Sequence, residues 1–398
     1  MKDNMLIVHG GAPTAVMNAS LFGAIRAAGD SGAVDMVYGA RGGSKALLTG
    51  DFIELSSLPA ATLEALPATP ASFLGTSRLA LEDADYDAIV DRLLERDIRF
   101  LLYNGGNGSM DSCGKIARSI ESRAPGKGIR VVGIPKTIDN DIAVTDHAPG
   151  FGSAARYLAA SVAELAQDVA SLPIHVCIIE SMGRNAGWLT AAAALAKPAC
   201  RYGKEADSRL GPHLIYTPEL PFDESRFLDE AKTLYDRFGG VVVVASEGLK
   251  GRDGKPIVAP IFQTGRSVYY GDVSAHLCGL VISKLGIKAR SEKPGILGRC
   301  SIAHQSALDR EEAIVAGKEA ARAALSGHSA VMVAFRLISS LPYRCETFLA
   351  PIEEVMLHER TLPLEYLTGE GNGIGPNYLE WCGPLVGEPF SVFAALPE

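Results

Sequence analysis

The stretch "RFLLYNGGNGSMDSCGKIARSIES" (residues 99–122) decides the fold class, because a continuous apolar run passes through a glycine-rich turn into a helical pattern. A run that is apolar at every position is typical of a parallel strand covered on both faces. The same succession joins "MLIVHGG" (5–11) to "AVMNASLFGAIRAAG" (15–29). Further strands are expected at "IRVVGIPK" (129–136), "IHVCIIES" (174–181), "GGVVVVASEG" (239–248) and "AVMVAFRL" (330–337). Strands that alternate with helices predict a doubly wound α/β fold, which binds ligands at the carboxyl ends of its strands.

The chain has 398 residues, too many for one ordinary core, so two domains are expected. The best break lies near "DHAPGFGSAARYLAASVAELA" (146–166), where a stretch containing Gly and Pro opens a long Ala-rich helix. The segment "LSSLPAATLEALPATPAS" (55–72) is expected to be irregular and to cover a surface.

Composition excludes several classes of protein. The net charge of −8 argues against a nucleic-acid surface built on bulk basicity. No apolar run approaches the ~20 residues of a membrane span, and no signal peptide opens the sequence. The seven cysteines are scattered without a CxxC pair, which favours reduced, buried thiols in a cytoplasmic protein.

Two glycine-rich turns follow predicted strands, in "HGGAPTAVMN" (9–18) and "NGGNGSMD" (104–111). Glycines let the backbone approach a phosphate, and the free N–H groups of a helix N-terminus attract anions. Each turn alone also reads as an ordinary strand-to-helix connection. Because both would lie side by side at the carboxyl edge of one sheet, the pair favours a polyphosphate ligand.

The stretch "GIPKTIDNDI" (133–142) places Lys136, Thr137, Asp139 and Asp141 where a strand should end. A hydroxyl that attacks a phosphoryl group needs a carboxylate to take its proton and cations to neutralise the transferring oxygens. In extended backbone the two aspartates point the same way, so that one can act as base while the other orients the acceptor or a metal-bound water. "TIDND" is equally compatible with a polar Asx-type turn, and these residues alone leave both interpretations open.

Three later stretches carry charged side chains beside predicted strand ends. Arg184 in "IESMGRNAGWL" (179–189) is a candidate phosphate ligand or a solvated arginine. Glu247, after the "VVVV" strand, can accept hydrogen bonds from sugar hydroxyls or cap the next helix. Arg290 and Arg299 in "KARSEKPGILGR" (288–299) can hold a phosphorylated substrate.

Taken in order from about residue 5 to about residue 325, these motifs resemble those of the phosphofructokinase family. The resemblance implies phosphorylation of the C1 hydroxyl of fructose 6-phosphate to fructose 1,6-bisphosphate, assisted by Mg²⁺. It gives Asp139 the role of general base, and assigns Thr137 and Asp141 to the sugar phosphate and the transferring group, with Lys136 stabilising the charge. The implied sugar-phosphate ligands are Met182, Gly183, Arg184, Glu247, Arg290 and Arg299, of which Arg184 is also expected to be catalytic. The implied donor ligands are Gly11, Arg78, Gly105, Gly106, Gly108 and Ser109.

The resemblance also implies an architecture of two Rossmann-like domains with the active site in the cleft between them. The donor-binding domain would comprise residues 1–149 and about 298–350, and the sugar-phosphate domain residues 150–297 and about 351–398. A homodimer or homotetramer is expected, because one sugar-phosphate arginine of the family typically comes from a neighbouring subunit.

The donor depends on three positions where members of the family differ. Many pyrophosphate-using members carry an aspartate in place of Gly108, and that side chain occupies the space of an ATP α-phosphate. Lys136 points the other way, because pyrophosphate-using members typically have lysine there. Asn107 replaces an aspartate often linked to the metal, so that it would bind Mg²⁺ through water. The wording of the motifs most resembles the pyrophosphate-using branch of the family. Because Gly108 removes the steric block, the sequence slightly favours ATP, with the same reaction from pyrophosphate as the alternative.

His175 stands where the family often has a basic residue, but the favoured interpretation is a histidine at a strand end. A second enzymatic hypothesis is a kinase of NAD or lipids, but those kinases resemble this chain only in the 104–109 loop.

The alternative to an enzyme is a non-catalytic regulator of this fold that binds sugar phosphate or nucleotide. No role is assigned to the chain after about residue 340.

Overall fold

The structure is a computed structural model that describes residues 3–77, 79–197, 209–264, 267–391 and 393–394. Its contacts divide the chain into two compact units. The first unit comprises Met1–Ser153 and Arg299–Arg360, and the second comprises Ala154–Gly298 and Thr361–Glu398. The boundaries lie at 153, 298 and 360, where the sequence placed them at 149, 297 and 350.

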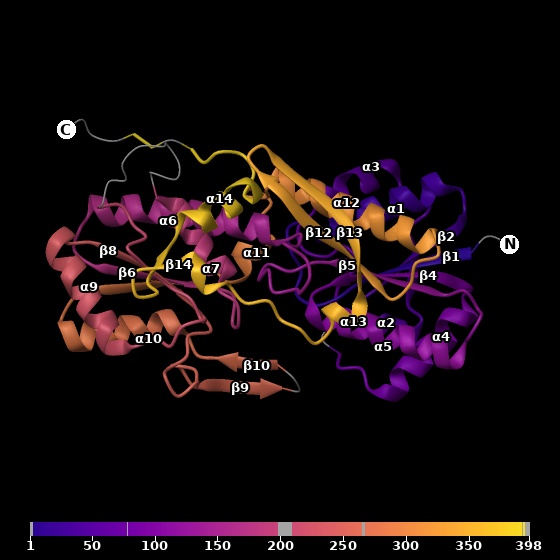
Figure 1. The fold of residues 1–398 in the computed structure, drawn as a ribbon, viewed down its shortest axis with the longest axis horizontal. Coiled ribbons are helices and arrows are strands. Elements are labelled where there is room, and N and C mark those ends of the chain that lie inside the picture. The colour runs from indigo at the N-terminus through magenta and orange to yellow at the C-terminus, as the bar shows by residue number, and fades with distance from the viewer. Residues whose placement is uncertain (1–2, 78, 198–208, 265–266, 392, 395–398) are drawn as a thin grey trace. The chain divides into compact units, whose positions relative to one another are not determined.

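The first unit is built on a seven-stranded sheet with the order β13-β12-β5-β4-β1-β2-β3 (Figure 1). The five inner strands pair in parallel, and the edge strands β3 and β13 are antiparallel to their neighbours. The strands are β1 (Asp3–His9), β2 (Val34–Ala40), β3 (Phe52–Glu54), β4 (Ile98–Gly105), β5 (Arg130–Pro135), β12 (Val331–Ser340) and β13 (Tyr343–Pro351).

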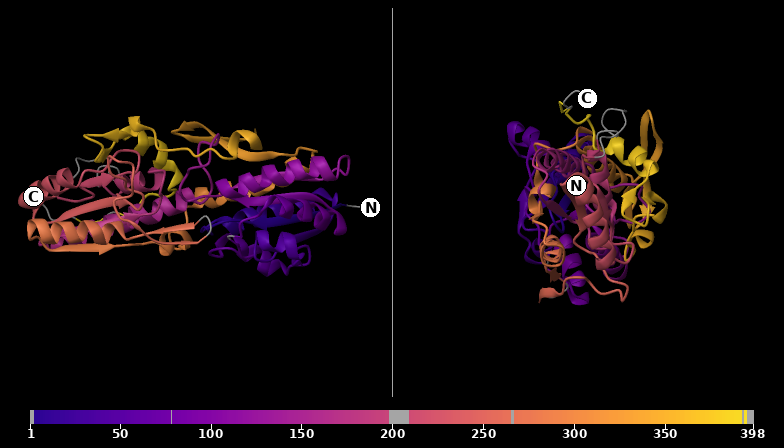
Figure 2. Two further views of the ribbon diagram at one scale, coloured as in Figure 1. Left: turned by 90° about the horizontal axis from the view of Figure 1, so that it is seen from below. Right: turned by 90° about the vertical axis from the view of Figure 1, so that its left-hand side faces the viewer.

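Helices cover both faces of this sheet, as Figures 1 and 2 show. Alternate residues of β1 enter different cores: Leu6 and Val8 pack with one set of helices, Met5 and Ile7 with the other. The first set is α2 (Ser44–Thr49), α4 (Asp83–Glu95), α5 (Asn107–Arg123) and α13 (Ile352–Val355). The second is α1 (Met17–Ser31) and α12 (Ala307–Leu325), joined by η1 (Leu66–Ala68), which follows α3 (Ala60–Ala65). The apolar runs are therefore buried on both faces, as the sequence predicted.

Helices α1 and α12 approach each other closely because glycines face backbone at their contact. A methyl group at Gly317 would lie 1.9 Å from the carbonyl oxygen of Ser20, and one at Gly23 would lie 2.1 Å from that of Ile314. No side chain fits at either position, so α12 is fixed tightly against α1.

The second unit contains a four-stranded parallel sheet with the order β11-β6-β8-β7. Its strands are β6 (Val176–Ser181), β7 (Leu214–Tyr216), β8 (Val241–Ser246) and β11 (Ala289–Glu292). Helix α9 (Glu224–Phe238), α10 (Val273–Leu280) and the π-helix η3 (Val281–Leu285) pack on one core with these strands. The other elements are α6 (Phe151–Ser171), α7 (Trp188–Ala192), η2 (Ala193–Ala196), β9 (Pro260–Thr264), β10 (Ser267–Tyr270), α11 (Ile296–Cys300), η4 (Leu364–Tyr366), β14 (Leu367–Thr368), β15 (Gly373–Ile374) and α14 (Pro376–Leu385).

The doubly wound α/β expectation is confirmed, but some segments differ from it. The segment 55–72 is not irregular throughout, since it contains α3 and η1, and Leu66 is buried in the core. Of the cysteines in the described residues, Cys300 and Cys345 are only partly buried, whereas the other four are buried. Cys200 lies outside the described residues. No helix of the described chain has the length and apolarity of a membrane span.

Candidate active site

The two glycine-rich turns lie side by side because β1 and β4 are neighbours, with His9 opposite Asn104. Gly10 donates its N–H to the Asn104 carbonyl at 2.8 Å. Ser109 fills the space between the turns: a methyl group at Gly10 or at Gly105 would lie 2.3 or 2.0 Å from its Oγ. Only glycine allows this approach of the two turns, so the predicted adjacency of the two glycine-rich turns is observed.

Lys136 extends this arrangement from the next strand, β5. Its N–H donates to the Gly105 carbonyl at 3.1 Å, and its Nζ donates to the Ala12 carbonyl at 2.7 Å. Burial lowers the pKa of Lys136 to about 8, and Arg299 adds to this effect, although Asp139 and Asp141 oppose it. A buried ammonium group therefore stands against the glycine turn that follows β1, where a phosphate would meet it.

The "TIDND" turn does not have the extended backbone that the sequence suggested. Asn140 has φ of 53°, a left-handed conformation, so the carboxylates of Asp139 and Asp141 are not related by simple alternation. Thr137 Oγ1 accepts the N–H of Asp139 at 3.0 Å and donates to Asp141 Oδ1 at 3.0 Å. The stretch is thus a polar turn whose side chains are held in place, and being a turn does not exclude it from being an active site.

Asn107 and Asp141 offer oxygen atoms that suit a hard divalent cation. Asn107 Nδ2 donates to Asp141 Oδ2 at 2.9 Å, which leaves the buried Asn107 Oδ1 with no hydrogen-bond partner among the described residues. Burial raises the pKa of Asp141, opposed by the hydrogen bond from Thr137 and by the charge of Lys136. Mg²⁺ takes oxygen ligands of this kind, together with water. The residues present therefore fit a divalent cation beside the turn.

Gly108 lies in the first turn of α5 and is exposed. A methyl group built on it would meet no atom within 4 Å. The space next to this position is open on the protein side. Of the other donor-site predictions, Gly11 has φ of 72°, whereas Arg78 lies outside the described residues.

In the second unit, the loops after β6 and β8 interlock. Ser246 Oγ donates to the Gly183 carbonyl at 2.7 Å, and the Glu247 N–H donates to the Ser181 carbonyl at 2.9 Å. This brings Arg184 Nε to 3.6 Å from Glu247 Oε1. A guanidinium group and a carboxylate, both partly exposed, thus stand together at the carboxyl ends of two parallel strands, with Met182 in the same loop.

Arg290 is not brought to this pair. It lies on β11 opposite Cys177, four residues before Ser181 and so about 13 Å back along the strand direction. Its neighbour is His175, whose pKa is lowered by burial and by the charges of Arg290 and Lys288. A neutral His175 agrees with the interpretation of a strand-end histidine. The three arginines predicted to bind the sugar phosphate therefore belong to different units: Arg184 and Arg290 lie in the second unit and Arg299 in the first.

A comparison with known families decides what these motifs belong to. The family model described as Phosphofructokinase matches residues 4–324. The chain belongs to the phosphofructokinase family. It is therefore a phosphotransferase with two Rossmann-like α/β units.

Three similar proteins match almost the whole of the chain. The pyrophosphate–fructose 6-phosphate 1-phosphotransferase of Xanthomonas campestris pv. campestris (strain B100) is 38% identical over 97% of this chain and 92% of its own. A sulfofructose kinase of Alkalicoccus urumqiensis is 31% identical over 96% of this chain and 95% of its own. The crystal structure of a pyrophosphate-dependent phosphofructokinase from Nitrosospira multiformis has a TM-score of 0.87 at 32% identity and covers 100% of this chain and 96% of that one.

One ion pair near the Arg184 and Glu247 loops was not predicted from the sequence. Lys293 Nζ lies 2.5 Å from Oε1 of the buried Glu180, and Glu180 Oε2 accepts the N–H of Ser274. Glu247 is among the charges that raise the pKa of Lys293, after burial, which lowers it, and the contribution of Glu180. Lys293 is visible in "SEKPG" (291–295), but a lysine in a basic stretch is expected to be exposed to solvent unless a buried partner such as Glu180 is known.

Proposed function

We propose that this phosphofructokinase transfers a phosphoryl group from inorganic pyrophosphate to the C1 hydroxyl of fructose 6-phosphate, forming fructose 1,6-bisphosphate. The observation that carries the proposal is that, in the first unit, Lys136 is buried against the glycine turn after β1 and Asp141 is hydrogen-bonded to Asn107 in the turn after β4, while the charges of Asp139 and Asp141 act on Lys136. A buried cation, two carboxylates and backbone N–H groups are the parts that phosphoryl transfer to a hydroxyl requires.

In the proposed reaction, Asp139 accepts the proton of the C1 hydroxyl while the oxygen bonds to the phosphorus atom of the donor. The bond between that phosphorus atom and the bridging oxygen breaks, and orthophosphate leaves. Thr137 fixes the turn and Asp141 orients the acceptor side. Lys136 neutralises charge on the transferring oxygens. Mg²⁺, held near Asn107, Asp139 and Asp141, would supply further neutralisation of the phosphate oxygens.

The sugar phosphate is assigned to the loops of the second unit. Arg184 offers a cation and Glu247 an acceptor for sugar hydroxyls, and their contact at 3.6 Å keeps both side chains in one place before the sugar binds. Arg299 of the first unit and Arg290 are the remaining proposed ligands of the 6-phosphate. Because the Alkalicoccus relative is named a sulfofructose kinase, sulfofructose is the second acceptor to assay.

Pyrophosphate is proposed as the donor on two grounds. The Xanthomonas relative and the Nitrosospira structure, which match nearly the whole chain, are both named for pyrophosphate. Lys136, the residue typical of pyrophosphate-using members, is buried against the first glycine turn. The preference for ATP that Gly108 suggested is not confirmed. ATP stays the second candidate, because the space beside Gly108 is open.

Initial rates with pyrophosphate and with ATP, measured on one preparation with fructose 6-phosphate and Mg²⁺, test the donor. The Gly108→Asp variant provides the matched comparison, since a Cβ atom added at this position meets no atom within 4 Å. We expect its pyrophosphate rate to stay within about threefold of the parent, and any ATP-dependent rate to fall at least about tenfold. A parent enzyme that uses ATP and not pyrophosphate would reverse the donor assignment.

A further inference from the structure

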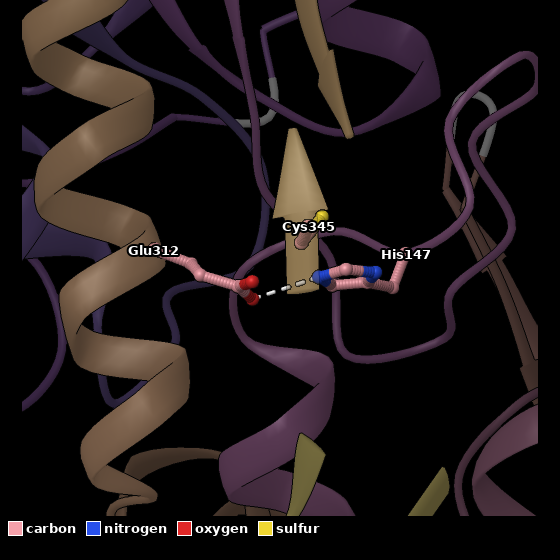
Figure 3. A group of neighbouring side chains, drawn as sticks. All are labelled: His147, Glu312 and Cys345. Atoms are coloured by element: carbon pink, nitrogen blue, oxygen red, sulfur yellow. Dashed lines mark hydrogen bonds and ion pairs between the residues drawn. The ribbon is translucent and has the colours of Figure 1, made fainter. Parts of the chain in front are cut away.

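A buried cluster in the first unit brings His147, in the loop that follows the "TIDND" turn, against Glu312 of α12 (Figure 3). His147, 3% exposed, contacts Asp146 Oδ1 through Nδ1 at 3.0 Å and Glu312 Oε2 through Nε2 at 2.7 Å. Its ring stacks on Phe335 with the centroids 5.2 Å apart. Both ring nitrogens face carboxylates, and this arrangement is satisfied only when the imidazole carries two protons.

The cluster continues onto β13. Tyr343 donates its hydroxyl hydrogen to Glu312 Oε1, so both oxygens of this buried carboxylate are engaged. Cys345 lies in the same group, with its Sγ within 4.8 Å of the ligand atoms of His147 and Glu312. A hollow of about 460 Å³ is lined in part by Glu312, Phe335 and Cys345. Glu312 therefore joins α12, β13 and the loop that contains His147.

The backbone on either side of His147 holds Asn140, the residue between Asp139 and Asp141 in the turn. Asn140 Oδ1 accepts the N–H of Ala148 at 3.1 Å, and Asn140 Nδ2 lies 3.5 Å from the Asp146 carbonyl. Asn140 is 1% exposed and has a left-handed backbone conformation, which costs free energy unless its surroundings hold it. A shift of His147 would therefore move the support of Asn140.

Helix α12 supplies a second anchor one turn before Glu312. The buried carboxylate of Asp309 accepts the N–H groups of Gly150 and Ser153 at 2.8 and 2.9 Å, and also the Ser153 hydroxyl. Because α12 is packed without space against α1, it forms a rigid platform. The segment 147–153 is thus attached to this platform at both ends, by Glu312 and by Asp309.

We propose that His147 is a positioning residue for phosphoryl transfer, which holds the Asp139–Asn140–Asp141 turn in its reactive geometry through its ion pair with Glu312. The inference rests on the proposed function for the role of Asp139, and extends it to residues that touch neither substrate. The link runs from Tyr343 through Glu312 and His147 to the backbone that supports Asn140.

The charged form of His147 is the one that the cluster requires. Burial by itself lowers the pKa of His147, but the charge of Glu312 and the hydrogen bonds of Asp146 and Glu312 raise it to about 9. The titratable groups that face the ring are Asp146 on its own loop, Glu312 on α12, and Tyr343 and Cys345 on β13. At neutral pH the imidazolium is therefore held between two carboxylates.

Variants at His147 test the link. His147→Phe removes both hydrogen bonds and the charge, and kcat is expected to fall about a hundredfold while KM for each substrate changes little, because only the geometry of the turn is disturbed. His147→Gln keeps one donor toward Glu312 and should recover most of that loss. His276→Gln is the matched control, since His276 pairs with Glu224 at 3.0 Å in the second unit.

Two readouts separate positioning from simple loss of stability. Tyr343→Phe, at a partly exposed residue, should lower kcat by a smaller factor with KM retained. Hydrogen exchange of the amides in 136–150 should quicken in His147→Phe and not in His276→Gln. This second readout does not depend on the reaction, so failure of the proposed function and failure of this inference can be told apart.

Three results would overturn the inference. The first is unchanged exchange in 136–150 in the His147→Phe variant. The second is a kcat in His147→Phe no lower than in the His276→Gln control. The third is stoichiometric zinc in the purified enzyme that is lost in Cys345→Ser, because the cluster would then be a metal centre and not a protonated link.

Discussion

Lys136 carries a charge at a position where burial opposes it. Its side chain is 4% exposed, and its pKa falls from 10.5 to about 8. Lowering the pKa of a lysine means that folding is disfavoured while the group is protonated. This penalty is fully present below pH 8 and disappears as the pH rises from about 8 to 10.5. A shift of this size lowers the free energy of unfolding by about 3 kcal/mol at neutral pH. Because the charge destabilises the fold, we infer that it is kept for the reaction.

Lys136→Met should therefore be more stable and less active. Removing the buried charge gains about 3 kcal/mol, and losing the hydrogen bond to Ala12 costs about 1 kcal/mol, so the free energy of unfolding at pH 7 should rise by about 2 kcal/mol. Denaturant titration of the ligand-free protein at pH 7 and pH 10 measures this. The gain should shrink at the higher pH. A variant that is less stable at pH 7 contradicts the account of Lys136.

At the scale of single residues, the sequence predicted that the two glycine-rich turns lie together, because strand ends of one parallel sheet share an edge, but not how the neighbouring side chains are held. Lys136, Asp139 and Asp141 were proposed as site residues because they follow one strand within a single short stretch. The left-handed Asn140 was missed, because its conformation is stabilised by Ala148 and Asp146 and not by its immediate neighbours. The contact of His147 with Glu312 spans 165 positions, which no local pattern reveals.

At the scale of elements, the loops after β6 and β8 act as one body. Gly248 is the tightest point, because a methyl group there would lie 1.8 Å from the carbonyl oxygen of Arg184. The backbone of Arg184 would have to move to relieve such a contact. The close approach of the Arg184 and Glu247 loops therefore requires glycine at position 248.

Gly248→Ala should weaken sugar-phosphate binding specifically. Displacing the Arg184 loop is expected to raise KM for fructose 6-phosphate at least about tenfold, with KM for the donor unchanged. The control is Gly279→Ala in α10, where the added methyl group meets no atom within 4 Å. Equal KM values in the two variants would show that the loops are not coupled in this way.

Elements were predicted well where burial made the pattern plain. Strand β8 ("VVVVAS") is buried at every position, and its continuous apolar run was enough to predict a strand there. The edge strand β13 was missed, because exposed and half-buried residues along it break the apolar pattern. Helix α3 was taken for irregular chain because prolines flank it and none of its residues is buried.

At the scale of the whole molecule, the position of Arg290 suggests that it serves the site of a second subunit. It stands about 13 Å along the strand direction from the loops that hold Arg184 and Glu247, beside a neutral His175. We therefore propose that the phosphofructokinase is a homo-oligomer in which Arg290 serves the sugar phosphate of a neighbouring subunit.

Mixing two inactive variants tests this arrangement. Arg290→Ala and Asp139→Asn subunits, unfolded together and refolded at equal amounts, should regain activity, because half of the sites in mixed dimers would contain both intact residues. About a quarter of the parental activity is expected for a dimer. Activity no greater than the sum of the separate variants would place Arg290 in the site of its own chain.

The central claim is that Asp139 takes the proton of the C1 hydroxyl during phosphoryl transfer. The most direct measurement is the rate of fructose 1,6-bisphosphate formation by the parent enzyme and by Asp139→Asn, at saturating pyrophosphate, fructose 6-phosphate and Mg²⁺. Asparagine retains the size of the side chain and removes only the proton acceptor, so the thermal midpoint should be preserved. We predict that the parent turns over and that the variant loses at least about a hundredfold in rate. A variant that keeps a near-normal rate would contradict the account.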